Sequence, residues 1–264
     1  MKRKPDSACN NLDGEEILEK APVIITSMSK ATHSLPELSS MTGFKTEKCQ
    51  LALIKPNACG LYYPSVELLS AVISLLYGYA DEIVVGEAES MVHSPEQQFK
   101  KLGITQLVAK FGEHVRTVNL SNDIVVKVKV PNPHVLLELR LPVSVVNSGV
   151  VINVPKVGVH ESILFTCALK NLFGVLPEKR KYDAYHVLGI NNVIADVAQV
   201  VKPNLNVVDA GEKVVVGVDP LSVDIVACRF INVDPSKVEH LKMVAKDRGE
   251  NLKDFIKKMH VTEL

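Results

Sequence analysis

The 264 residues include 30 basic and 30 acidic side chains, which gives a formal net charge of zero at pH 7. A chain without excess positive charge lacks the attraction that holds proteins on nucleic acid, so we expect no polynucleotide partner. Hydrophobic residues make up 47% and charged residues 23%, the composition of an ordinary globular protein. No apolar run is long enough for a membrane span, and no apolar signal-peptide core follows Lys2, Arg3 and Lys4, so we expect neither a membrane partner nor a signal peptide.

The cysteines are odd in number and show no paired metal-ligand spacing such as C-x-x-C. This pattern favours free thiols in a reducing compartment, and we therefore expect a cytoplasmic protein. The chain also lacks an iron–sulfur cluster motif. The cysteines are Cys9, Cys49, Cys59, Cys167 and Cys228.

Strand-like and helix-like patterns alternate along most of the chain. Short apolar or β-branched runs bounded by turn residues predict strands at 21–26, 51–54, 82–86, 150–154, 205–208 and 214–218. Apolar residues at helical spacing predict helices at 64–78, 94–103, 161–174, 190–201, 220–230, 235–246 and 252–259, with a short one from Leu35. The alternation predicts an α/β fold, with a mostly parallel sheet and helices on both faces.

The alternation breaks between residues 115 and 141. Residues 124–130 and 134–141 each alternate apolar and polar side chains on either side of a Pro-Asn-Pro turn. We therefore predict a single α/β domain over residues 1–264, with an antiparallel hairpin at about 115–141 that extends the main sheet. Its charged residues are expected to form solvated cross-strand pairs. These residues are Lys127, Lys129, Glu138 and Arg140.

Residues 147–174 form the stretch on which the functional hypothesis depends. A β-branched run interrupted only by Asn153 predicts a strand buried on both faces. Lys156 and His160 follow it, and a nearly all-apolar helix is predicted at 161–174. In this arrangement both side chains lie where the carboxyl end of a strand meets the amino end of a helix, a place that attracts anions.

Lys156 and His160 are therefore the predicted catalytic pair. Lys156 supplies a fixed positive charge, and His160 fits three roles: general acid or base, metal ligand, or helix cap. His186 follows a loop at 175–185 that is long enough to return over the same edge as a lid. The other histidines are expected in loops or on outer helical faces; they are His33, His93, His114, His134, His240 and His260.

Further polar residues follow the ends of other predicted strands. Ligands bind outside the carboxyl edge of an open parallel sheet, so these side chains are expected to share a cleft. Lys170 and Asn171 interrupt the apolar helix and must reach water or a polar partner, because an unpaired buried ammonium is costly. The predicted ligand-binding residues are Lys55, Asn57, Glu87, Lys170, Asn171, His186, Asp209 and Asp219.

A metal site would draw on His160, His186, Glu87 and Asp209, because imidazole and carboxylate suit zinc, iron or manganese. No close-spaced pair such as H-x-x-x-H supports this site. The glycine spacing of a Walker loop or a dinucleotide fingerprint is also missing. The sequence therefore names no cofactor, and a divalent metal is the candidate class.

Five short motifs carry a resemblance to a known family: IKPN at 54–57, VVGE at 84–87, VPKVGVH, ALKNLFG and VDP at 218–220. In their order and spacing, over about 51–230, the chain resembles the domain of unknown function 362 family. The resemblance implies an α/β fold and a family whose biochemical activity is not established. Many relatives carry an added ferredoxin-like cluster segment, which this chain lacks; it also departs at Cys167, where a glycine is expected, and at Tyr63, where a threonine is usual.

Two functional hypotheses follow from these patterns. The first is an enzyme that binds a small anionic substrate, bearing a phosphate or a carboxylate, at the carboxyl edge of the sheet, with or without a metal. The second is a non-catalytic binding or assembly partner in a redox or iron–sulfur pathway, which the cluster-bearing relatives imply and which would require a redox protein partner. The sequence leaves the substrate, the reaction and the oligomeric state open.

Overall fold

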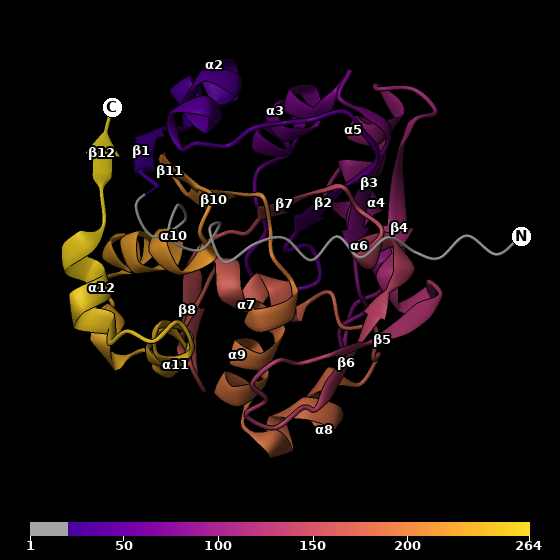
Figure 1. Cartoon of the computed structure of the whole chain (residues 1–264). Helices are drawn as coiled ribbons and strands as arrows, with labels where there is room; N and C mark the ends of the chain where they lie inside the picture. The colour runs from indigo at the N-terminus through magenta and orange to yellow at the C-terminus, as the bar shows by residue number, and fades with distance from the viewer. Residues whose placement is uncertain (1–20) are drawn as a thin grey trace, which may run out of the picture.

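The computed structural model describes residues 21–264, so the basic residues at positions 2–4 and Cys9 lie outside the described part of the chain. Eight strands form the main sheet in the order β12-β1-β11-β10-β7-β2-β3-β4 (Figure 1). The strands are β1 Val23–Ser27, β2 Cys49–Pro56, β3 Ala80–Glu87, β4 Val115–Asn119, β7 Val150–Val154, β10 Leu205–Ala210, β11 Lys213–Gly217 and β12 Val261–Glu263.

The sheet is mostly parallel. Strand β11 runs antiparallel to both of its neighbours, β10 and β1, and the other neighbouring pairs between residues 21 and 264 are parallel. Helices cover both faces, with α2 and α3 on one side and α7, α9 and α10 on the other (Figure 1). The predicted α/β fold is therefore confirmed.

The two layers of helices bury alternate residues of the strands, because successive side chains of a strand point to opposite faces. Ile54 packs with the first layer and Leu53 with the second. The first layer contains α2 Met28–Met41, α3 Val66–Leu76, α4 Pro95–Lys101 and α5 Ile104–Ala109. The second contains α7 Ala168–Phe173, α9 Ile190–Val200, α10 Pro220–Ala227, α11 Glu239–Asp247 and α12 Leu252–Lys258. Short helical turns complete the chain: η1 Leu120–Asn122, α6 Val143–Val146, α8 Lys181–Tyr185, η2 His186–Leu188, η3 Cys228–Ile231 and η4 Pro235–Lys237.

Serine hydroxyls set the start of three helices in the first layer. Ser94 caps α4 as its sequence predicts, and Ser65 caps α3. Helix α2 begins at Met28, before the predicted start at Leu35, because the Ser27 hydroxyl accepts the Lys30 N–H at 3.1 Å. None of the helices in the described part of the chain combines the length and apolar character that a membrane span requires.

The predicted antiparallel hairpin forms from β5 Val125–Lys129 and β6 Glu138–Pro142. It is a separate two-stranded sheet, so the prediction that it extends the main sheet is wrong. The hairpin is held by packing of Leu139 and Leu141 on the core and by the buried Asp196 carboxylate of α9, which accepts the backbone N–H groups of residues 134–136 at 2.7–3.0 Å.

The predicted helix at 161–174 is also wrong in its first half. The chain forms a second hairpin, β8 Gly158–His160 and β9 Leu164–Thr166, and α7 begins only at Ala168. The start of α7 is set by Asp224 of α10, whose carboxylate accepts the N–H groups of Ala168 at 2.6 Å and Leu169 at 2.9 Å. A residue distant in sequence thus supplies the cap that the local sequence lacks.

Candidate active site

Three neighbouring strands place a polar side chain at the same level of the sheet. Lys55 of β2 pairs in register with Asn153 of β7, and Asn153 pairs with Asn206 of β10. All three residues are fully buried on the face that α7 covers. Asn153 and Asn206 were not predicted as site residues, although a polar residue inside a β-branched run is the signal that could have found them.

The Lys55 ammonium has three protein acceptors. It donates to Glu87 Oε1 at 2.7 Å, to the Pro56 carbonyl oxygen at 2.8 Å and to Asn171 Oδ1 at 3.1 Å. An ammonium group has three N–H donors, so each one has an acceptor. Lys55 is therefore an internal ion-pair partner and has no donor left for a ligand.

Asn171 continues this network into α7. Its amide donates to the Lys55 carbonyl oxygen at 3.0 Å and to Asn153 Oδ1 at 2.8 Å. The amide of Asn153 in turn donates to Asn206 Oδ1 at 2.9 Å and to the Ala168 carbonyl oxygen at 3.1 Å. The network ties α7 to the centre of the sheet, and it turns Asn171 inward, away from a ligand.

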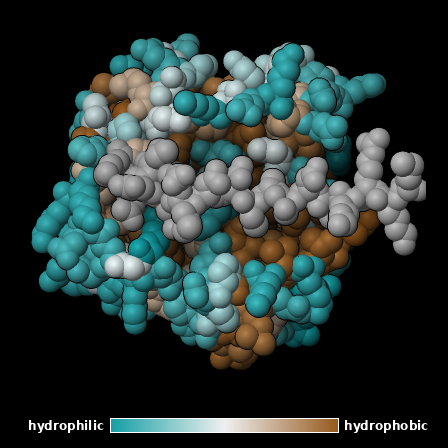
Figure 2. Space-filling model, in the orientation of Figure 1, coloured by the Kyte–Doolittle hydropathy of each residue, from teal (hydrophilic) through white to brown (hydrophobic). Residues whose placement is uncertain are grey.

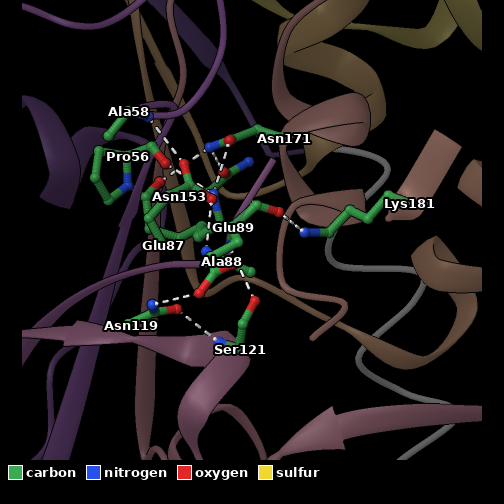
Figure 3. Close-up of polar contacts among 11 residues, drawn as sticks. Pro56, Ala58, Glu87, Ala88, Glu89, Asn119, Ser121, Asn153, Asn171 and Lys181 are labelled. Carbon is green, nitrogen blue, oxygen red and sulfur yellow. Dashed lines mark hydrogen bonds and ion pairs between the residues drawn. The ribbon is translucent and has the colours of Figure 1, made fainter. Parts of the chain in front are cut away.

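Glu87 and Gly174 complete the surroundings of Lys55. The Glu87 carboxylate also accepts the N–H groups of Ala58 at 2.8 Å and Ala88 at 3.0 Å (Figure 3). A Cβ atom on Gly174 would lie 2.9 Å from Lys55 Nζ and 3.2 Å from Glu87 Oε1. The same Cβ atom would lie 2.9 Å from the Asn171 carbonyl oxygen. Gly174 ends α7 with an ordinary right-handed φ of −68°, so the close approach of the ion pair and of this carbonyl group, and not a left-handed turn, requires glycine here.

A group of basic side chains lies next to this network, and we call it the cationic cluster: Lys170, Lys181, His160 and His186. Lys170 lies over the Phe173 ring, 4.1 Å from its centroid, and forms no ion pair with a carboxylate within residues 21–264. Burial, together with the nearby charges of Lys181 and Lys55, lowers the pKa of Lys170 to about 8. Burial and the Lys55 charge also lower the pKa of Lys181 to about 8, although Glu87 opposes this shift.

The segment after Gly174 returns over the carboxyl edge of the sheet. Lys181 donates to the Glu89 carbonyl oxygen just beyond β3 (Figure 3), and Lys179 Nζ lies 3.0 Å from Glu89 Oε1. His186 stacks on Tyr182 with 4.2 Å between ring centroids. These contacts hold Lys179 and Lys181 beside the residue that follows β3, and the role of residues 175–186 as a lid stays a prediction.

The two histidines of the cluster share an electrostatic environment. Burial lowers the pKa of His160, and the charges of Lys170 and His186 lower it further. Burial and Lys170 likewise lower the pKa of His186. At neutral pH both rings are therefore held in the uncharged form, and Nδ1 of His160 accepts the Ser162 N–H at 3.2 Å.

His240 lies behind the cluster and corrects a sequence expectation. It was expected on an outer helical face, but it is fully buried, stacked on Phe165, with Nδ1 3.0 Å from Asn191 Oδ1. Burial lowers its pKa to about 3, with a further contribution from Lys170. Its Nε2 has no hydrogen-bond partner within the described residues.

Lys156 lies in a different cluster from His160. Its Nζ is 3.1 Å from Asp209 Oδ1, and Asp209 also accepts the N–H groups of Ser65 and Gly211, each at 2.9 Å. The predicted pairing of Lys156 with a helix amino terminus is wrong because the helix begins at Ala168. Lys156 and Asp209 balance one another and fasten the ends of β7 and β10.

Asp219 lies at the opposite edge of the sheet from the other predicted residues. It follows β11, whose last residue, Gly217, pairs with Asn206 near the start of β10. Because β11 is antiparallel, its carboxyl end coincides with the amino ends of the parallel strands. Asp219 caps α10 and binds Arg248 at 2.8 Å; burial opposes its ionisation, but Arg248 and Ser222 keep its pKa below the ordinary value.

The remaining predicted residues do not form a metal centre. Within residues 21–264, no three His, Cys, Asp or Glu side chains are grouped so that they could hold a metal ion. Glu87 and Asp209 belong to separate ion pairs, which keeps them from joining His160 and His186. Asn57 lies half-buried in the loop after β2, beside Gly60.

Two cavities lie elsewhere in the molecule, and no residue of the cationic cluster lines either of them. One, of ≈ 140 Å³, lies between the tip of the first hairpin and helices α9 and α11. The other, of ≈ 330 Å³, lies beside α6, and Figure 2 shows hydrophobic side chains gathered near β5. Its apolar lining consists of Val128, Leu141, Val145, Val146, Val151, Val200 and Val201.

The fold and the site define an α/β protein with a mostly parallel sheet, a buried lysine–glutamate pair and a cationic cluster at the carboxyl edge. The family model described as Domain of unknown function (DUF362) matches residues 52–229, and the chain belongs to this family. A comparison with curated proteins finds no match.

One similar solved structure is the lactate racemase apoprotein from Thermoanaerobacterium thermosaccharolyticum. The two chains share 11% sequence identity with a TM-score of 0.48, over 81% of this chain and 58% of that chain. A likeness of this size concerns the fold and identifies no ligand.

Proposed function

We propose that this protein is an enzyme that binds a small anion, bearing a carboxylate or a phosphate, at the cationic cluster. The observation that carries the proposal is Lys170, a half-buried ammonium beside Lys181 that has no carboxylate partner within residues 21–264. Two neighbouring ammonium groups repel one another, and burial removes the water that would screen them. An anion placed between them would remove this unfavourable interaction.

The chemistry that these groups favour is proton transfer. General acids and bases work best when their pKa lies near the working pH. Lys170 and Lys181, each with a pKa of about 8, meet that condition. Clusters of shifted pKa values occur preferentially at functional sites, which supports an enzyme over a purely structural role.

The thiols support a reducing location. Cys59, Cys167 and Cys228 are buried and unpaired, and burial raises the pKa of Cys59 to about 12, so it stays a thiol. Free buried thiols fit a protein of the cytoplasm, and we propose that location.

The experiment is a thermal unfolding series with phosphate, acetate and citrate, repeated for Lys170→Gln and Lys156→Gln. An anion at a hundred times its Kd should add about 2.7 kcal/mol of stability to the unmodified protein. Lys170→Gln should lose this effect. Lys156→Gln is the matched control and should keep it, because Lys156 is paired with Asp209.

Two outcomes would contradict the proposal. One is stabilisation that survives in Lys170→Gln, since the anion would then bind elsewhere. The other is no stabilisation by any of the three anions, together with capture of a redox protein from a lysate, which would favour the second hypothesis from the sequence.

A further inference from the structure

We propose that residues 178–189 form a strap that opens and closes at the carboxyl edge of the sheet, and that Glu89 is the residue that holds the strap closed. The strap carries two members of the cationic cluster, Lys181 and His186, and the other two members belong to β8 and α7. The inference rests on the proposed function, because the position of the strap decides whether the four members of the anion site are brought together.

The strap lies on the surface and has few buried side chains. Residues 175–177, which precede it, are buried, and α9 begins directly after it at Ile190. Within the strap only Lys181 and Tyr185 are buried, and most of the other residues are exposed. A segment with so few buried side chains separates from the protein at a lower free-energy cost than an element of the core.

Two side chains of the strap bind Glu89, the second residue after β3. The Lys181 ammonium donates to the Glu89 carbonyl oxygen (Figure 3), and Lys179 Nζ lies 3.0 Å from Glu89 Oε1. Glu89 is fixed in turn, since its N–H donates to Ser121 Oγ at 2.9 Å and its Oε1 accepts the Asn119 amide at 3.1 Å. A single residue therefore joins the strap to the end of β4 and to η1.

The ends of the strap are held by contacts that do not involve Glu89. Tyr185 packs edge-on against Phe173 of α7, with 5.6 Å between ring centroids, and its hydroxyl donates to Glu178 at 2.6 Å. Glu178 also pairs with Arg140 of β6 at 3.4 Å. Gly189 ends the strap with φ 81° and ψ 104°, a conformation that favours glycine, and a glycine at this position suits a hinge. The strap can therefore release its lysines from the loop after β3 while its two ends stay attached.

Closure of the strap buries the Lys181 ammonium, and this burial opposes closure. The oxygen that accepts its hydrogen bond belongs to a backbone carbonyl group, which carries no full charge to balance the ammonium. Burial lowers the pKa of Lys181 to about 8, so the closed strap holds the charged form at a cost. Lys179 is 59% exposed, so its ion pair with Glu89 offsets only part of this cost. The closed and open states are therefore close in free energy.

An anion bound at the cationic cluster shifts this balance. In the closed state the anion has the charge of Lys181 beside it, and in the open state it lacks that interaction. A ligand shifts an equilibrium toward the state that it binds more tightly, so the anion favours the closed strap. The strap thus couples access to the site with occupation of the site.

The test is limited proteolysis of the full chain with a protease that cleaves only after lysine. Such a protease must take the Lys181 side chain into its own pocket, so it cleaves after Lys181 only when that side chain has left Glu89. When opening and closing are fast, the rate of cleavage follows the population of the open state. Peptide mass spectrometry measures this rate, and cleavage after Lys253 of α12 reports unfolding elsewhere.

Glu89→Ala should raise the rate of cleavage after Lys181 about three- to tenfold, because it removes the ion pair with Lys179 and leaves the strap sequence unchanged. Glu82→Ala is the matched control and should leave the rate unchanged, because Glu82 forms an exposed ion pair with Arg116. Lys179→Gln breaks the same ion pair from the strap and should also raise the rate, so the inference can be tested even if Glu89→Ala does not fold.

Two results would overturn the inference. One is an unchanged rate of cleavage after Lys181 in Glu89→Ala and in Lys179→Gln. The other is an increase that cleavage after Lys253 matches, because the variants would then unfold as a whole.

Citrate separates this inference from the proposed function. Slower cleavage after Lys181 with citrate, relative to cleavage after Lys253, supports both proposals when Glu89→Ala raises the rate. A raised rate in Glu89→Ala without any effect of citrate or phosphate supports the strap and contradicts the anion site. Thermal stabilisation by citrate without a raised rate in Glu89→Ala supports the anion site and overturns the strap.

Discussion

The Lys55 ammonium lies 2.7 Å from the Glu87 carboxylate, with the two side chains only 0% and 4% exposed. Two opposite charges in a water-free interior are stable as a pair, but either one alone carries a large desolvation cost. Both residues also hold backbone groups of the loops that follow β2 and β3. The ion pair therefore has a structural role: it positions the neighbouring cationic cluster, whose side chains are the proposed ligand-binding groups.

We expect Lys55→Ala to lower the free energy of unfolding by about 3–5 kcal/mol, because it leaves the Glu87 charge buried and unpaired. Lys156→Ala should cost only about 1–2 kcal/mol, because Lys156 is 34% exposed and Asp209 keeps two backbone donors. Urea unfolding of both variants at pH 7 measures the difference. Equal losses would show that Lys55 is not a buried ion-pair partner.

Gly174→Ala should destabilise the protein by about 1–3 kcal/mol, because its Cβ would lie 2.9 Å from Lys55 Nζ. A double-mutant cycle provides the control. In a Lys55→Met background the same substitution should cost less, since the contact with the Lys55 ammonium is gone and only those with the Asn171 carbonyl oxygen at 2.9 Å and Glu87 Oε1 at 3.2 Å remain. An identical cost in both backgrounds would point to a backbone effect at Gly174.

Lys170→Met should stabilise the protein at pH 7 by about 1–3 kcal/mol, since it removes a half-buried charge and keeps a side chain of similar length. The folded-state pKa of about 8 lies below the ordinary 10.5. Below pH 8 Lys170 is protonated in both the folded and the unfolded state, and the folded state carries the full free-energy cost of the buried charge. Between pH 8 and 10.5 Lys170 loses its proton first in the folded state, so this cost disappears. The gain in stability should therefore shrink from pH 7 to pH 10, measured by urea unfolding, and Lys253→Met should show no such trend.

Asp219→Ala should lower stability by about 2–4 kcal/mol, because it removes both the cap of α10 and the buried ion pair between Asp219 and Arg248. Anion affinity should not change, since Asp219 lies at the edge of the sheet opposite the cationic cluster. Asp234, an exposed cap that also precedes a proline, is the matched control, and Asp234→Ala should have a smaller effect. Loss of anion binding in folded Asp219→Ala would show that Asp219 contributes to the anion site.

Leu164 occupies a tight turn with a left-handed φ of 65°, closed by a bond from the Phe165 N–H to the Ile163 carbonyl oxygen at 2.8 Å. Such a turn is strained for a bulky residue, and it lies opposite His160 in the second hairpin. Leu164→Gly should stabilise the protein by about 0.5–1 kcal/mol, because glycine adopts this φ without strain. Val159→Gly, in the extended strand of the same hairpin, should destabilise it, and thermal unfolding compares the two.

The sequence alone determined most of the framework. Short apolar or β-branched runs predict β2, β3, β7 and β10, and Ser94 with Pro95 predicts the start of α4, because these signals depend on neighbours within a few residues. The polar residues at strand ends were also visible, and the parallel strands do bring Lys55 and Glu87 together. Local chemistry decides such features, so they can be read along the chain.

The tertiary structure decided the rest. Helix α7 begins at Ala168 because Asp224, 56 residues further along the chain, caps it. Asp219 lies away from the cationic cluster because β11 runs antiparallel to its neighbours. The pKa of Lys170 is lowered first by burial and then by the charges of Lys181 and Lys55, which lie on other elements. Caps, strand direction and electrostatic fields depend on which segments meet in space, and one-dimensional patterns do not contain those distances.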